Sequence, residues 1–290
     1  MRVSSTNAMI AGIAMCDLVT AGTVISEKSL TWIVESSSCI NPNAYLYQLT
    51  IFVINALGKT TVRISFWLAI LLVLVRLLAL RTKTKISYLG KSTKGLWICL
   101  FTYITCFALS GNMYGRMVLS EMSNSTWSPP TECSKSYNQP KYIVKFPEQT
   151  ARIHLDIYKG FVAFSQAVSS VIYPFLAFVL YIQVRRSAKM ISLTNYAIGL
   201  ERHRITRMIL CVTLSYVISS VPRSIIWITL ETVNITTNSF LEILTNYGFC
   251  ITSIFFSINA SSQCVICFFL SSKYRHTAKM LLMIRPTNVK

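Results

Sequence analysis

Long apolar stretches, separated by shorter polar or charged segments, dominate the chain. A membrane-spanning helix needs about 20 mostly apolar residues. Six stretches meet that length, at residues 7–26, 45–80, 95–119, 160–184, 208–230 and 247–271. The second stretch is too long for one crossing, and no turn signal divides it cleanly, so we expect one tilted helix that projects outward. The pattern therefore predicts an all-α integral membrane protein, with a single transmembrane domain over residues 1–290.

Composition and charge support this interpretation and set the topology. Only 13% of the residues are charged, against about 25% in soluble domains. The net charge of +18 would suggest nucleic acid on a soluble face. Here 17 of the 28 basic residues lie at Arg2 and in the segments 81–94, 185–207 and 273–290. Because Lys and Arg stay in the cytoplasm, we expect a multi-pass plasma-membrane protein with both ends of this chain inside. The basic segments would contact anionic lipid, with no nucleic-acid partner.

The opposite segments, placed outside, hold eight of the ten acidic residues. They also contain Cys39 and Cys133, the only two cysteines in these segments. Because that compartment is oxidising, we predict a disulfide between them; the alternative is two free thiols. Asn124 and Asn234 each begin an Asn-x-Thr glycosylation pattern, and both fall on the side that charge assigns to the outside.

Ionisable residues inside apolar stretches are costly and usually functional. Asp17 lies in the middle of the first stretch; the alternative is a protonated carboxyl that only locks packing. Lys59 and Arg63 lie one turn apart in the second stretch, so we expect both on one face that lines a cavity. Arg76 lies near the inner end of that stretch, where the sequence alone favours a snorkelling arginine. The sequence shows no metal-ligand set, phosphate loop or carboxylate pair, so we expect neither an enzyme nor a metal centre.

Several motifs resemble rhodopsin-like G-protein-coupled receptors in their order and position. They resemble most closely the nematode serpentine receptor class w, which is related to FMRFamide receptors. The motifs are 13–18, 63–69 leading to 75–77, Tyr173-Pro174, Pro222, 259–263 and 271–275. The resemblance implies a seven-helix bundle from which this chain lacks the first helix, leaving six spans and a helix expected ahead of Met1. It also implies a short amphipathic cytoplasmic helix at about 272–284.

The resemblance implies a neuropeptide receptor, FMRFamide-like, that passes ligand binding to a heterotrimeric G protein. Two alternatives stay open: a non-signalling truncated remnant, and a membrane transporter, although the halves of the chain show no internal repeat. The chain departs from the family pattern at Val75, where an acid usually precedes Arg76, at Ser220, and at Ala260, where a proline is usual. The first two departures affect a resting-state lock and a switch.

The resemblance also implies roles for individual residues. A polar core around sodium and water would be formed by Asp17, Ser65 and Asn259, since a carboxylate and neutral oxygens suit a hard cation. The alternative is a water-filled network without an ion. Coupling to the G protein would use Arg76, Tyr274 and Arg275.

For the ligand we expect a short cationic peptide that enters from the outside. Glu231 and Glu242 flank the last outer loop, which has no Lys or Arg between them, so they are the best partners for an arginine side chain. Lys59 and Arg63 would meet a carbonyl or carboxylate deeper in the bundle. The alternative is that the outer acids are only solvated loop charges.

Overall fold

The computed structural model describes residues 5–81, 92–131, 133, 138–145, 151–190 and 196–232, together with part of 240–261. The chain forms two compact units, which are described separately. The first unit comprises Asn7–Leu68 and Ser92–Val162, and the second comprises Met1–Thr6, Ala69–Lys91 and Ala163–Lys290.

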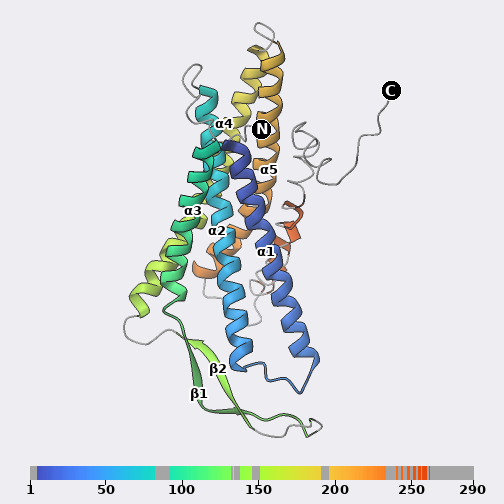
Figure 1. Ribbon diagram of the computed structural model, residues 1–290, viewed down its shortest axis with the longest axis vertical. Helices are drawn as coiled ribbons and strands as arrows, with labels where there is room; N and C mark the ends of the chain where they lie inside the picture. Colours follow the sequence, from blue (N-terminus) through green and yellow to red (C-terminus); the bar gives the residue numbers. More distant parts are fainter. Residues whose placement is uncertain are drawn as a thin grey trace, which may run out of the picture. The chain divides into compact units, whose positions relative to one another are not determined.

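Three long helices build most of the first unit: α1 (Ser5–Ser36), α2 (Tyr45–Arg81) and α3 (Ser92–Tyr114). In lipid an isolated segment must satisfy its own backbone hydrogen bonds, so an apolar run of this length folds as a helix. A turn over residues 37–44 reverses the chain between α1 and α2 (Figure 1). Within it the Asn41 Oδ1 accepts a hydrogen bond from the Asn43 backbone N–H at 2.9 Å.

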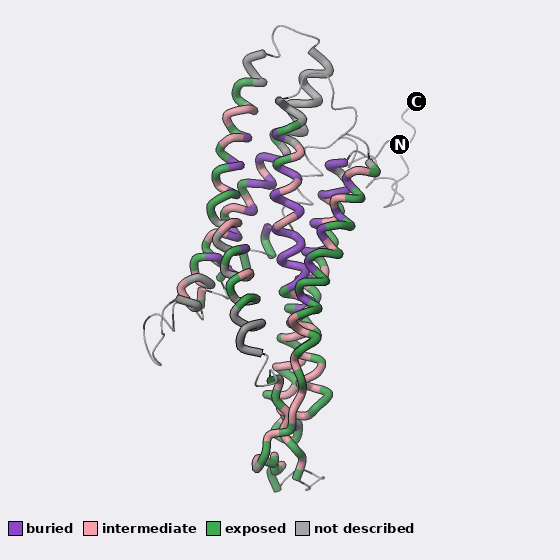
Figure 2. Tube along the Cα trace, turned by 90° about the vertical axis from the view of Figure 1, so that its left-hand side faces the viewer, coloured by how far each residue is buried: buried purple, intermediate pink, exposed green. Residues whose placement is uncertain are grey.

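An antiparallel β-hairpin follows α3, formed by β1 (Val118–Trp127) and β2 (Gln139–Lys145). The strands pair regularly from Val118↔Lys145 to Glu121↔Tyr142, and an irregularity then shifts the register before Thr126↔Pro140. Most of its described side chains are half-buried or exposed, whereas fully buried residues recur along the helices (Figure 2).

The second unit contains the greater part of α4 (Ala151–Met190) and all of α5 (Tyr196–Thr232). These helices contain Pro174 and Pro222 respectively. Tyr173 and Tyr216 are fully buried and stack with ring centroids 6.0 Å apart. The described residues of 240–261 are helical, and Asn259 among them is buried.

The helices agree with the predicted membrane protein, with corrections at their ends. Four described helices are long and apolar enough to cross a membrane, in α1, α2, α3 and α5, and a shorter apolar stretch lies in α4. The stretch 45–80 is one helix, as predicted. The stretch 95–119 was predicted to be helical throughout, but α3 ends at Tyr114 and Leu119 lies in β1. The predicted helix is therefore too long at its C-terminal end, where Val118 and Leu119 pair in the hairpin instead.

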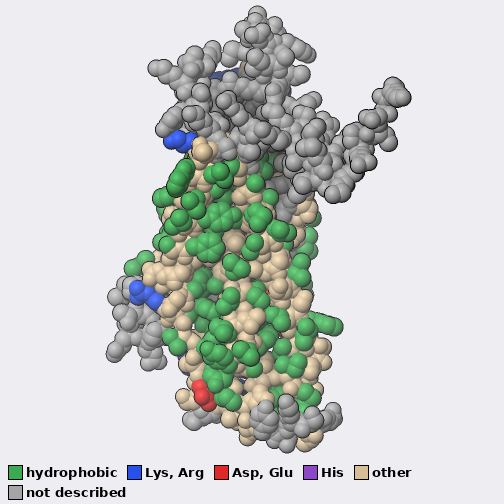
Figure 3. Space-filling model, viewed as in Figure 1, with side chains coloured by type: hydrophobic (Ala, Val, Ile, Leu, Met, Phe, Trp, Pro, Cys, Tyr) green, Lys and Arg blue, Asp and Glu red, His purple; other side chains and the backbone are tan. Residues whose placement is uncertain are grey.

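Large apolar side chains cover much of the described surface (Figure 3). On α3, Trp97 and Phe101 are 68% and 72% exposed. Such exposure would be unfavourable in water, but lipid solvates these side chains as well as a protein core does. The surface therefore agrees with a chain that spans the membrane.

Candidate functional site

A buried hydrogen bond joins the middle of α1 to the middle of α2. The Ser65 hydroxyl donates to Asp17 Oδ1 at 2.8 Å, and the two residues are 0% and 2% exposed. A carboxyl at this depth is costly unless polar groups surround it. This pair unites two of the three residues predicted for the polar core. The third, Asn259, is buried in the second unit.

The pair can contribute to a cation site. A carboxylate oxygen and a hydroxyl oxygen are ligands that hard cations prefer, and both are enclosed here away from bulk water. Asp17 and Ser65 therefore fit the sodium ion that the family resemblance implies, and they would supply two of its oxygen ligands.

Nearer the turn between α1 and α2, a layer of small and hydroxylated residues brings the two helices close together. The hydroxyl oxygens of Thr20 and Thr61 lie 2.8 Å apart. Gly58 lies against Thr23, so that a Cβ added at Gly58 would be 2.7 Å from Thr23 Oγ1. Helices in membranes approach closely through such residues. This layer was not predicted from the sequence, although threonines and a glycine at helical spacing were a possible signal.

A third set of contacts fastens α3 to α1. The Tyr103 hydroxyl donates to the Gly12 carbonyl oxygen at 2.9 Å, and Cys16 Sγ lies 2.9 Å from the same hydroxyl. Cys99 packs beside Gly12, with its Sγ 3.3 Å from the position of an added Cβ. The sequence carried no signal for this pairing, because Cys16 and Tyr103 are 87 residues apart.

Arg63 is the buried cation of the first unit's described core. It is 8% exposed, and its Nη1 donates to Ser110 Oγ on α3 at 3.1 Å. Its guanidinium also lies over the Phe161 ring, 5.8 Å from the centroid. Lys59, one turn away, is exposed. The prediction that both line one cavity is therefore wrong for Lys59, because the enclosed part of α2 begins only at Thr60.

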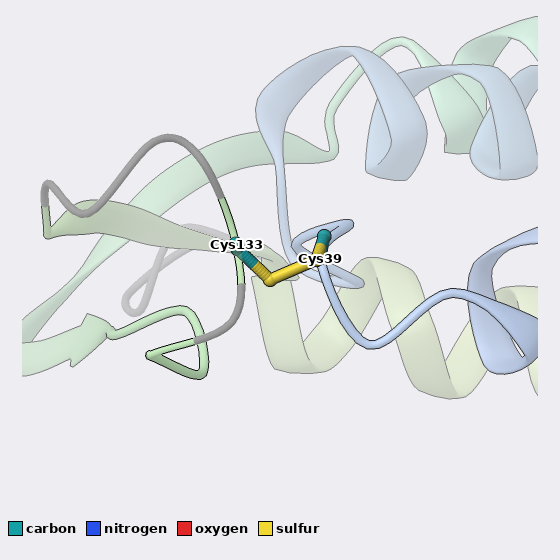
Figure 4. The surroundings of a disulfide bond; sticks show 2 residues. All are labelled: Cys39 and Cys133. Carbon is teal, nitrogen blue, oxygen red and sulfur yellow. A yellow bond between two sulfur atoms is a disulfide. The ribbon is translucent and has the colours of Figure 1, made fainter.

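The end of the first unit that carries the α1–α2 turn is cross-linked to the hairpin. Cys39 and Cys133 form the predicted disulfide, with Cα atoms 5.7 Å apart (Figure 4). The Tyr142 backbone N–H donates to the Asn43 carbonyl oxygen at 2.8 Å. The Tyr142 ring also packs edge-on against Tyr45 at the start of α2. The α1–α2 turn is thus held to the hairpin in two places: covalently at the loop between β1 and β2, and by hydrogen bonding and ring packing at β2.

The remaining predicted residues are located only in part. Arg76 lies in α2, Glu231 in the last turn of α5 and Asn124 in β1, and the backbone alone is described for them. Outside the described residues lie Glu242, Asn234, Tyr274, Arg275 and the predicted helix at 272–284.

Comparison with known proteins gives a match over almost the whole chain. The family model described as "Serpentine type 7TM GPCR chemoreceptor Srw" matches residues 1–285. No curated protein matches the chain.

Proposed function

Because the chain belongs to the Srw family of serpentine seven-transmembrane GPCR chemoreceptors, we propose that it is gated by a short cationic peptide, FMRFamide-like, and activates a heterotrimeric G protein. The family membership makes it a multi-pass membrane receptor, which is a non-enzymatic class. The peptide, its charge and the orientation with both ends of this chain in the cytoplasm are our proposal.

The hairpin fixed to the α1–α2 turn is the observation that best supports a peptide ligand. It presents exposed side chains and strand backbone at the end of the first unit that carries the disulfide. A peptide can use both kinds of group, since main-chain hydrogen bonds supply affinity and side chains supply specificity. A small apolar odorant would use neither.

Charge distribution supports the cationic character of the ligand. Eight of the ten acidic residues lie in the segments that the charge rule assigns to the outside, but six basic residues lie there too. Steering at long range is therefore weak, and salt screens it beyond about 8 Å. Local contacts must select the ligand, and Glu231 and Glu242 are proposed as contacts for an arginine side chain.

Signalling follows from a population shift, in which the ligand binds the active bundle more tightly than the resting one. We propose that Arg76, near the inner end of α2, then contacts the G protein together with Tyr274 and Arg275. An acid does not precede this arginine, since Val75 occupies that position.

The test is nucleotide exchange on purified G proteins by the receptor in nanodiscs. Amidated and free-acid peptides, small amines and lipids are compared as agonists. The proposal expects activation by a cationic peptide. The Arg76→Ala variant should lose exchange while it keeps peptide binding, whereas Arg81→Ala at the end of the same helix should keep both. Activation by amines or lipids alone would refute the peptide class, and unchanged exchange by Arg76→Ala would return Arg76 to a snorkelling role.

A further inference from the structure

One edge of strand β1, its outer edge, has no backbone partner among the residues that the structure describes. Among the described residues, β1 forms backbone hydrogen bonds with β2, and no other described segment bonds to its backbone. The outer edge of β2, by contrast, is covered, because the Tyr142 N–H donates to Asn43 and the Pro140 carbonyl accepts from the Asn41 side chain. An uncovered edge strand is a template for a further strand.

The register identifies which groups face outward. In an antiparallel pair, opposed residues alternate between those that bond to each other and those whose N–H and C=O point away. The N–H of Tyr142 points away from β1, because it donates to Asn43. Its partner Glu121 therefore also points its backbone groups outward, and so does Leu119, two residues earlier. The edge thus offers two donors and two acceptors at the spacing that an extended chain requires.

The side chains beside that edge carry one sign of charge. Glu121 is exposed and is the only charged residue in 117–127. Because side chains alternate between faces, it shares its face with Leu119, Tyr142 and Val144. The lysines of β2, Lys141 and Lys145, project from the opposite face. The face that carries Glu121 therefore favours the binding of a Lys or Arg side chain, which would lie beside the Tyr142 ring.

Strands that form exposed edges usually carry protection against pairing, such as proline or lysine. In the hairpin those residues lie in β2, whose edge is already covered, and β1 has neither over Val118–Trp127. The register irregularity after Glu121 limits the regular part of the edge to Val118–Glu121. That length accommodates a peptide of about four residues.

We propose that the peptide ligand binds as a third strand along β1, pairing with the backbone of Leu119 and Glu121 and placing a cationic side chain beside Glu121. This inference rests on the proposed peptide function and specifies its binding mode. The disulfide and the contacts of β2 hold the hairpin in place before binding, so that little ordering is required when the peptide pairs.

The test begins with a library of amidated tetra- to hexapeptides that each contain one Arg or Lys, screened by nucleotide exchange. Each backbone nitrogen of the active peptide is then methylated in turn. We expect methylation to weaken binding about two- to tenfold at every second position of the peptide. At those positions the methyl group removes a hydrogen bond to β1, whereas the N–H groups between them point away from the strand. Glu121→Gln should weaken binding about two- to fivefold. The matched control, Lys145→Gln on the other face, should not.

The outcomes separate the inference from the function. If a cationic peptide activates the receptor but methylation shows no alternation, the third-strand mode is refuted and the peptide function stands. Equal effects of Glu121→Gln and Lys145→Gln would likewise refute the assigned face. If no peptide activates the receptor, the function is refuted and the binding mode with it. Mapping of the Cys39–Cys133 disulfide in each variant shows that the hairpin remains folded.

Discussion

The close approach of α1 and α2 makes Gly58 sensitive to a single added methyl group. In a Gly58→Ala variant the new Cβ would lie 2.7 Å from Thr23 Oγ1 and 3.4 Å from Thr23 Cβ. Thr23 cannot simply rotate away, because β-branched side chains are stiff at χ1 and its hydroxyl donates to the Thr20 carbonyl oxygen at 2.7 Å. The helices must therefore separate or the threonine must lose its hydrogen bond.

Gly22 provides the matched control, because an added Cβ there meets no atom within 4 Å. Both substitutions gain helix propensity, about 1 kcal/mol from glycine to alanine. The difference in stability between the two variants therefore reports the steric clash between the new Cβ and Thr23. Overpacking of this kind costs about 1–3 kcal/mol. At roughly 2–4 °C per kcal/mol, Gly58→Ala should unfold several degrees below Gly22→Ala.

The buried thiols of Cys16, Cys99 and Cys106 supply the assay, since a thiol-reactive dye labels them only when the detergent-solubilised receptor unfolds. A second substitution, Thr23→Ala, removes the obstructing oxygen and should restore much of the stability lost by Gly58→Ala. Equal midpoints for Gly58→Ala and the control variant, or no recovery by Thr23→Ala, would refute the packing argument.

Four further substitutions test the remaining contacts. In a double-mutant cycle, Asp17→Asn and Ser65→Ala should show a coupling of about 0.5–2 kcal/mol; additive effects on the thermal midpoint would contradict the hydrogen bond. Sodium should raise the midpoint of the unmodified receptor but not of Asp17→Asn, and a sodium-insensitive receptor would exclude the ion. Cys39→Ser should leave Cys133 open to alkylation and speed amide exchange in the hairpin; unchanged exchange would show that the other contacts suffice. Arg63→Ala should lower the free energy of unfolding by roughly 1–3 kcal/mol, because a partner on α3 loses a charged hydrogen bond; an unchanged thermal midpoint would count against that role.

The elements inside the membrane were predictable from the sequence. Lipid offers the backbone no hydrogen-bond partners, so a sufficiently long apolar run folds as a helix. This is why the whole of 45–80 could be predicted as one helix. The disulfide between Cys39 and Cys133 was predictable for a related reason, since the predicted topology left no other cysteine on the same side.

The hairpin was not predictable in the same way. Outside lipid, water competes for the backbone hydrogen bonds. The strands β1 and β2 form only because each supplies hydrogen-bond partners to the backbone of the other. The bond from Tyr142 to Asn43 joins residues 99 positions apart. No local pattern in the outer segment specified that contact.

Helix neighbours were also decided by tertiary structure. Periodicity indicates which residues share a face of one helix, but not which helix covers each turn of it. Lys59 and Arg63 lie one turn apart on α2. They nevertheless differ in burial, because α2 is buried on every side only from Thr60 to Phe66. The sequence by itself determined the membrane helices and Asp17 as a buried ionisable residue. Only packing of the folded helices decided that Ser65 meets Asp17, because side-chain contacts depend on helix rotation and depth, which no local pattern encodes.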